Sequence, residues 1–167
     1  ILRRDFELPA KGFLYTNYQK GTFVIDLMGN TLTSTYSEHL FSSNGTQVHD
    51  TNTVVKNGTL VSGKGLWSVS TNANAPNKTQ SITFENLNIT VAWSHVAFHN
   101  NSKAAGKVNI NYVNCNITMT GSVSGIFQAG KDADDTNFVT DITVTGGSLT
   151  LDSFPADKFV REYNGGS

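Results

Sequence analysis

The stretch Val108–Thr120, VNINYVNCNITMT, reads as two short strands joined by a sharp bend. Successive side chains of a strand point to opposite faces. Ile110 and Tyr112 therefore share one face before the bend, and Ile117 and Met119 return to that face after it. The residues between them are mostly Asn and Thr, which predicts that the opposite face meets water.

Four other segments repeat this pattern when one apolar residue in each is matched to Ile117. The five anchor residues are Leu32, Leu60, Ile89, Ile117 and Leu149, spaced 28, 29, 28 and 32 residues apart. The positions seven and five residues before each anchor are apolar in nine of ten cases, and Thr53 is the exception. Three residues before the anchors lie Gly29, Asn57, Asn86, Asn114 and Gly146. Gly and Asn tolerate the left-handed backbone of a tight bend, so the pattern predicts a repeat protein of β type.

Composition agrees with many short strands joined by turns. The 167 residues are 38% hydrophobic, with 15 Gly and only 3 Pro, and the formal net charge is −1. A near-neutral charge gives no electrostatic reason to expect nucleic acid or an anionic membrane as a partner. No run of 18 apolar residues occurs, so we expect no membrane insertion.

A third apolar pair follows each pair of strands, as in Leu40-Phe41 and Leu66-Trp67. Trp67 aligns with Leu40 and Val96, which predicts a place in the core. Three stacked strands per repeat describe an all-β fold, a single-stranded parallel β-helix of about five coils, and crossover connections favour the right hand.

The predicted organisation has three parts. We expect an N-terminal cap or the remnant of a preceding coil over residues 1–20, the β-helix over 21–160, and a C-terminal tail over 161–167. The chain starts at Ile1 and ends in Gly-Gly-Ser, which suggests a mature chain or an excised piece of a longer protein. The single Cys115 lies at the second bend position, so we interpret it as structural.

The coil with Asn at its bend resembles the pectin-lyase-like right-handed β-helix superfamily over roughly residues 21–155. IDLMGNTLTS at 25–34 is similar to the "IDLNGHTLT"-type openings of β-helical segments in bacterial cell-surface and adhesin proteins. The resemblance implies the architecture and an extracellular or cell-surface location. This scaffold serves lyases, hydrolases, phage tailspikes and non-catalytic adhesins alike, so the resemblance leaves the activity open.

Catalytic motifs of the superfamily are missing. Relatives that resemble polygalacturonases carry Asn-Thr-Asp, Asp-Asp, Gly-His-Gly and Arg-Ile-Lys motifs. Here Asp134-Asp135 is the only Asp-Asp pair, and it falls in a predicted loop. Arg occurs only at positions 3, 4 and 161, outside the regular coils. The sequence therefore offers no catalytic residue, and it favours a protein that is not an enzyme.

Two groups of residues are candidates for ligand binding. Trp93, His95 and His99 follow the anchor Ile89, where an exposed indole could stack on a sugar ring; burial of Trp93 is the alternative. His95 and His99 are not expected to share a metal ion, because the segment is not predicted to be helical.

The second candidate group is the acidic loop with Asp132, Asp134 and Asp135. Its oxygen ligands could hold a hard cation such as Ca²⁺, while the plainer interpretation is a solvated insertion without a cofactor.

The leading functional hypothesis is a non-enzymatic extracellular recognition or adhesion module. It would bind a glycan or host-surface ligand, a polysaccharide or glycoprotein, through loops on the flank of the β-helix. A second hypothesis is a fragment of a polysaccharide-degrading enzyme, a lyase or hydrolase such as a phage tailspike, for which a trimer would be expected. A third is a structural spacer of a surface protein. Binding without cleavage, cleavage, or neither would separate the three.

Overall fold

The computed structural model describes residues 1–10, 14–16, 20–35, 39–43, 49–69, 78–92, 106–121, 127–131, 138–152 and 160–164. Every regular element in these ranges is a strand. The strands are β1 (Phe6–Glu7), β2 (Leu14–Tyr15), β3 (Gly21–Asp26), β4 (Thr31–Ser34), β5 (Phe41–Ser43), β6 (Thr51–Ser62), β7 (Trp67–Val69), β8 (Lys78–Val91), β9 (Gly106–Met119), β10 (Phe127–Lys131), β11 (Phe138–Leu151) and β12 (Val160–Asn164). Within the described ranges, no helix is long and apolar enough to cross a membrane.

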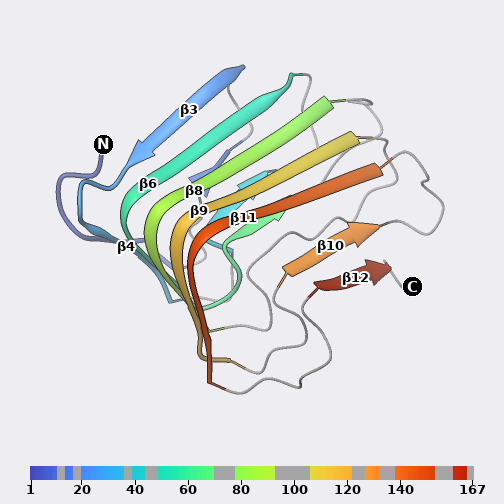
Figure 1. Cartoon of the computed structure of the whole chain (residues 1–167). Helices are drawn as coiled ribbons and strands as arrows, with labels where there is room; N and C mark the ends of the chain where they lie inside the picture. Colours follow the sequence, from blue (N-terminus) through green and yellow to red (C-terminus); the bar gives the residue numbers. More distant parts are fainter. Residues whose placement is uncertain are drawn as a thin grey trace.

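The main sheet has the order β1-β4-β6-β8-β9-β11, and β3 also pairs with β6. Two smaller sheets contain β2-β5-β7 and β10-β12, and all strand pairs are parallel. Strands β6, β8, β9 and β11 run side by side and bend together at the same level (Figure 1). The chain is an all-β parallel β-solenoid of about three turns, which confirms the all-β class and the parallel stacking of the repeats.

The repeated segments pair in the predicted register. The five anchors form one column, in which Leu32, Leu60, Ile89, Ile117 and Leu149 are successive partners. Three residues earlier the chain turns with positive φ angles, 59° at Asn57, 53° at Asn86 and 52° at Asn114. Gly29 and Gly146 take φ angles of 85° and 68° at the equivalent bends. The Asn and Gly spacing thus marks the left-handed bend residues, as predicted.

The interior is a stack of apolar side chains. The Phe84 and Tyr112 rings are stacked with centroids 5.3 Å apart, and the Phe41 ring lies 6.0 Å from that of Phe84. Trp67 is 1% exposed, and its Nε1–H donates to Oγ1 of Thr16 over 3.1 Å. Each such fully buried side chain contributes about 1.5–3 kcal/mol. The predicted core position of Trp67 is confirmed.

The register of the third strands differs by one residue from the expectation. Trp67 pairs with Phe41, not with Leu40. Leu40 and Leu66 directly precede the paired residues and are themselves fully buried. Phe41 lies nine residues after its anchor Leu32, and Trp67 lies seven residues after Leu60, so sequence spacing alone does not fix this pairing.

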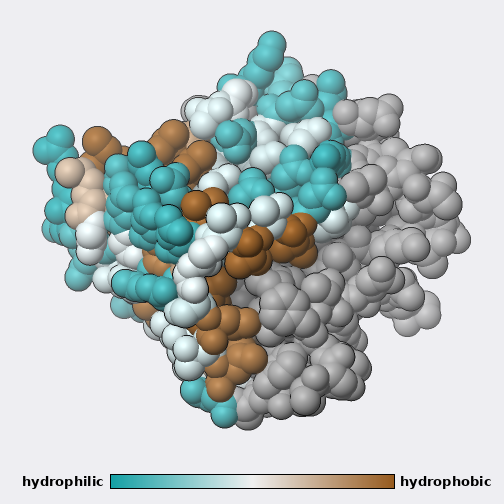
Figure 2. All heavy atoms as spheres, in the orientation of Figure 1, coloured by the Kyte–Doolittle hydropathy of each residue, from teal (hydrophilic) through white to brown (hydrophobic). Residues whose placement is uncertain are grey.

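Burial falls sharply at β11. Val144 and Leu149 are 51% and 37% exposed, whereas their register partners Tyr112 and Ile117 in β9 are 1% and 3% exposed. In Figure 2 apolar brown atoms lie along the inner side of β11. The same column of the fold is therefore a core in the middle of the stack and a partly wet surface at β11.

Candidate functional site

A shallow hollow of about 470 Å³ lies on the outer face of the main sheet, near the start of its strands. Among the described residues, it is lined by side chains from β3, β6, β8 and β9 and from Asp50 just before β6. Its lining includes the side chains of Thr22, Asp50, Asn52, Ser81, Thr83 and Asn111. We call it the polar hollow. Mostly hydrophilic atoms cover the beginning of these strands (Figure 2).

Strand alternation and register place these groups side by side. Thr22, Asn52 and Ser81 are successive partners in one outward column, and Thr83 and Asn111 are partners in the next. The outward position follows from period two, because the flanking residues Ile82 and Ile110 are fully buried. The polar side chains of the hollow therefore stand on strands whose backbone is held in place by hydrogen bonds to the adjacent strands.

Within each column, side-chain amides link neighbouring strands, and the later strand donates to the earlier one in each case. Asn111 Nδ2 donates to Oγ1 of Thr83 over 3.2 Å, and Asn52 Nδ2 donates to Oγ1 of Thr22 over 3.4 Å. Beside them, Asn109 Nδ2 donates to Oγ of Ser81 over 3.1 Å. Each hydroxyl that accepts in this way keeps its own hydrogen for donation. The surface thus offers ordered hydroxyl and amide groups.

Asp50 is the charged residue among the described residues that line the hollow. Its Oδ1 accepts the backbone N–H of Thr79 over 2.8 Å, which fixes the carboxylate at the rim. Further along the same face, Lys107 Nζ lies 2.8 Å from Oδ2 of Asp141. The carboxylate of the hollow has no second carboxylate beside it in the described lining.

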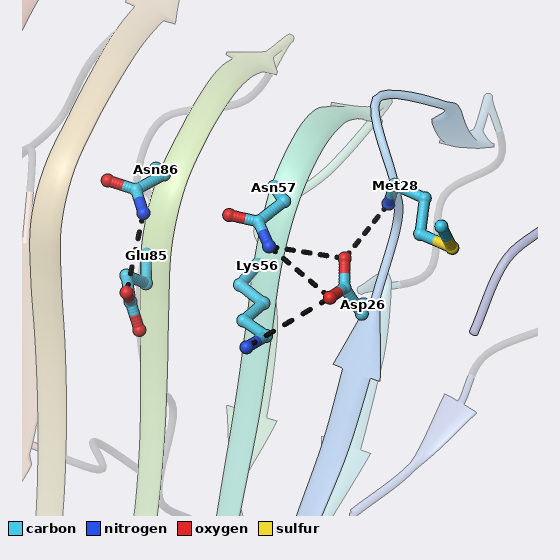
Figure 3. A network of polar contacts seen from close by, with 6 residues as sticks. All are labelled: Asp26, Met28, Lys56, Asn57, Glu85 and Asn86. Atoms are coloured by element: carbon cyan, nitrogen blue, oxygen red, sulfur yellow. Dashed lines mark hydrogen bonds and ion pairs between the residues drawn. The ribbon is translucent and has the colours of Figure 1, made fainter.

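The other polar cluster lies at the bend, where Asp26 meets the next strand (Figure 3). Its Oδ1 accepts the backbone N–H of Met28 over 3.0 Å, and its two oxygens accept from Nδ2 of Asn57 over 3.2 and 3.3 Å. The Met28 hydrogen bond, then the Asn57 amide and the Lys56 charge, lower the pKa of Asp26. An ionised carboxylate tied in this way holds the bend, so we assign it a structural role.

Cys115 is buried at the bend of β9. It is 3% exposed, and its thiol donates to the carbonyl oxygen of Phe84 over 3.3 Å. Burial raises the pKa of this thiol, which disfavours the reactive thiolate. The structural interpretation of Cys115 agrees with this environment.

The binding residues proposed from sequence lie outside the described part of the chain. These are Trp93, His95, His99, Asp132, Asp134 and Asp135. They stay predictions, as does a Ca²⁺ ion at the acidic loop. In the described ranges, no group of three or more His, Cys, Asp or Glu side chains is arranged to hold a metal ion.

The polar hollow is not among the binding sites predicted from the sequence. A signal was present, because Asn109 and Asn111 alternate with buried Ile110 and Tyr112 in β9. Only the register between strands shows that such residues meet hydroxyls of the preceding strand.

Comparison with protein-family models, with curated proteins and with solved structures found no match.

Proposed function

We propose that this protein is a non-enzymatic extracellular recognition or adhesion module, which binds a glycan of a polysaccharide or glycoprotein through the polar hollow. The observation that carries the proposal is the hollow itself, where hydroxyl and amide side chains converge on a rigid sheet. Sugar hydroxyls both donate and accept hydrogen bonds, and ordered hydroxyl and amide groups match them without rearrangement.

The proposal includes the finer architecture predicted from sequence. We propose that the parallel solenoid of about three turns is part of a right-handed β-helix of about five coils with three strands each, related in design to the pectin-lyase-like superfamily. Parallel crossover connections are right-handed in nearly all proteins. The five matched segments of the main sheet and the strands β5, β7, β10 and β12 support three strands per coil.

Binding without bond cleavage is favoured by the carboxylates. Hydrolysis of a glycosidic bond generally needs two carboxyl groups on opposite sides of that bond. Among the described lining residues Asp50 is the one carboxylate, and it already accepts the Thr79 N–H. The hollow therefore supports a ligand site better than an active site.

The test is a glycan-array screen followed by titration of the best ligand, with each well then assayed for cleavage products. Asn111→Ala removes one amide from the hollow and should weaken binding about five-fold. Asn116→Ala is the matched control, because Asn116 lies in the same strand and makes the same kind of hydrogen bond, to Oδ1 of Asn88 over 3.1 Å. The control should bind as the wild type does.

Equal affinities of the two variants would place the ligand elsewhere, and Trp93→Ala and Asp134→Ala would then test the loops. New reducing ends or unsaturated uronate products would contradict the non-enzymatic proposal and favour a degrading enzyme. Silence of the whole array would favour a structural spacer.

A further inference from the structure

The charges and the shape of the polar hollow point to one class of glycan. We infer that its ligand is a neutral, hydroxyl-rich polysaccharide that lies across the four strands, from Thr22 to Asn111. The inference rests on the proposed function and adds to it the charge of the ligand and its direction on the sheet.

The charge of the surface around the hollow disfavours an anionic ligand. Asp50 is the charged residue in the described lining, and its carboxylate would repel an anionic chain. Lys107, which lies in register with Thr79 at the rim, is held by Asp141 in an ion pair of 2.8 Å. A uronate chain would meet one uncompensated negative charge and a cation that is already neutralised. A neutral sugar avoids both costs.

The hollow presents both hydrogen-bond donors and hydrogen-bond acceptors to a ligand. Thr22, Ser81 and Thr83 each accept an amide hydrogen from the following strand, so their hydroxyl hydrogens can be donated to a ligand. The amide oxygens and Asp50 are acceptors. Sugar hydroxyls satisfy both kinds of group, whereas a carboxylate can only accept.

The lining of the hollow crosses several strands, which bears on how a long ligand would lie. The lining residues come from four neighbouring strands, from Thr22 of β3 through β6 and β8 to Asn111 of β9. Neighbouring strands lie about 4.8 Å apart, so the hollow extends about 14 Å along the axis. Along a single strand the lining extends from Thr79 to Thr83 of β8, about 13 Å, and contains three residues. A chain molecule that crosses the strands meets polar side chains of all four, first in the column of Thr22 and then in that of Asn111, whereas one that follows β8 meets three.

A matched pair of polymers tests whether the ligand is neutral. Polygalacturonate and the neutral polymer made by reducing its carboxyl groups share linkage and length. We expect the neutral polymer to bind at least about ten-fold more tightly, with an affinity that does not change between low salt and about 0.15 M salt. Asp50→Lys should reduce the ratio between the affinities for the neutral polymer and for polygalacturonate. Asp50→Asn should still accept the Thr79 N–H and should keep the affinity for the neutral polymer.

A series of neutral oligosaccharides of increasing length tests the direction. Affinity should rise until the oligomer spans the four strands. Long oligomers should lose about five-fold in affinity with either Thr22→Ala or Asn111→Ala, and the shortest ones should respond to one of the two only. Far-UV circular dichroism and thermal unfolding check that each variant folds.

The outcomes separate the inference from the proposal beneath it. Tighter binding of polygalacturonate, weakened by salt, would overturn the neutral ligand and leave glycan recognition standing. Oligomers of every length responding equally to both variants would overturn the direction across the strands. Absence of binding to both polymers and to all array glycans would overturn the inference together with the proposed function.

Discussion

Gly58, at the residue scale, has almost no room for a side chain. A Cβ atom there would lie 2.5 Å from the carbonyl oxygen of Asn30 and 2.6 Å from Cβ of Leu27. The obstacle includes backbone, so it cannot rotate away. At Gly29 a Cβ would meet nothing within 4 Å, although φ is +85°.

We therefore predict that Gly58→Ala lowers the free energy of unfolding by about 3 kcal/mol through crowding. Gly29→Ala should lower it by about 1 kcal/mol through backbone strain alone. Urea unfolding followed by circular dichroism measures both. Equal losses would mean that the chain around Gly58 relaxes to admit a methyl group.

Asp26 makes the stability depend on pH. Its pKa is lowered by the Met28 N–H, the Asn57 amide and the Lys56 charge. A carboxyl group with a lowered folded pKa stabilises the protein above its unfolded pKa, and this contribution is lost as the pH falls through the folded value. Asp26→Asn keeps an acceptor for Met28 but has no charge.

We expect Asp26→Asn to destabilise the protein at pH 7, with a difference from wild type that shrinks below about pH 4. Urea midpoints at a series of pH values measure this. A difference that stays constant from neutral to acid pH would show that the charge of Asp26 has no part in its role.

At the scale of the element, each long strand depends on its left-handed bend residue. Asn114 takes φ of 52°, and its Nδ2 donates to Oδ1 of Asn86 over 3.3 Å. Two positions later, Asn116 does not have a positive φ angle. Its Nδ2 donates to Oδ1 of Asn88 over 3.1 Å. Either change to Ala removes an amide hydrogen bond within the column, and Asn116→Ala also removes the one that Asn116 Oδ1 accepts from Ser148 over 2.9 Å, so a larger loss at Asn114 must come from the bend.

We predict that Asn114→Ala costs about 1 kcal/mol more than Asn116→Ala, because Ala disfavours the left-handed region. Asn114→Gly should recover part of this difference, since Gly adopts positive φ freely. Thermal unfolding of the three variants provides the comparison. Identical midpoints for Asn114→Ala and Asn116→Ala would contradict a special role of the bend.

The same elements show what the sequence can predict. Column register and bend positions could be predicted because an apolar anchor such as Ile117 and a bend residue such as Asn114 recur together at nearly constant spacing. The Phe41 and Trp67 pairing could not, because the segments before them differ in length. The polar hollow could not be predicted either, since the groups that meet across its strands are 28 to 30 residues apart and come together only through the register.

At the scale of the whole molecule, the anchor column contains equivalent side chains in different surroundings. Leu60 is fully buried between neighbours on both sides, and Leu149 in the same column is 37% exposed. The two positions carry the same residue, so they compare burial directly.

Leu60→Ala should therefore cost about 3 kcal/mol and Leu149→Ala about 1 kcal/mol. Urea unfolding monitored by tryptophan fluorescence measures both values. A loss at Leu149 as large as that at Leu60 would show that the inner face of β11 is packed in solution.

The constant register also bears on how the chain folds as it is synthesised. Partners in the main sheet from β4 onwards are 28 to 32 residues apart, so no described segment of it waits for one that emerges much later. A strand leaving the ribosome finds its template in the strand completed just before it. The solenoid can then fold during synthesis by adding one coil after another at its C-terminal end.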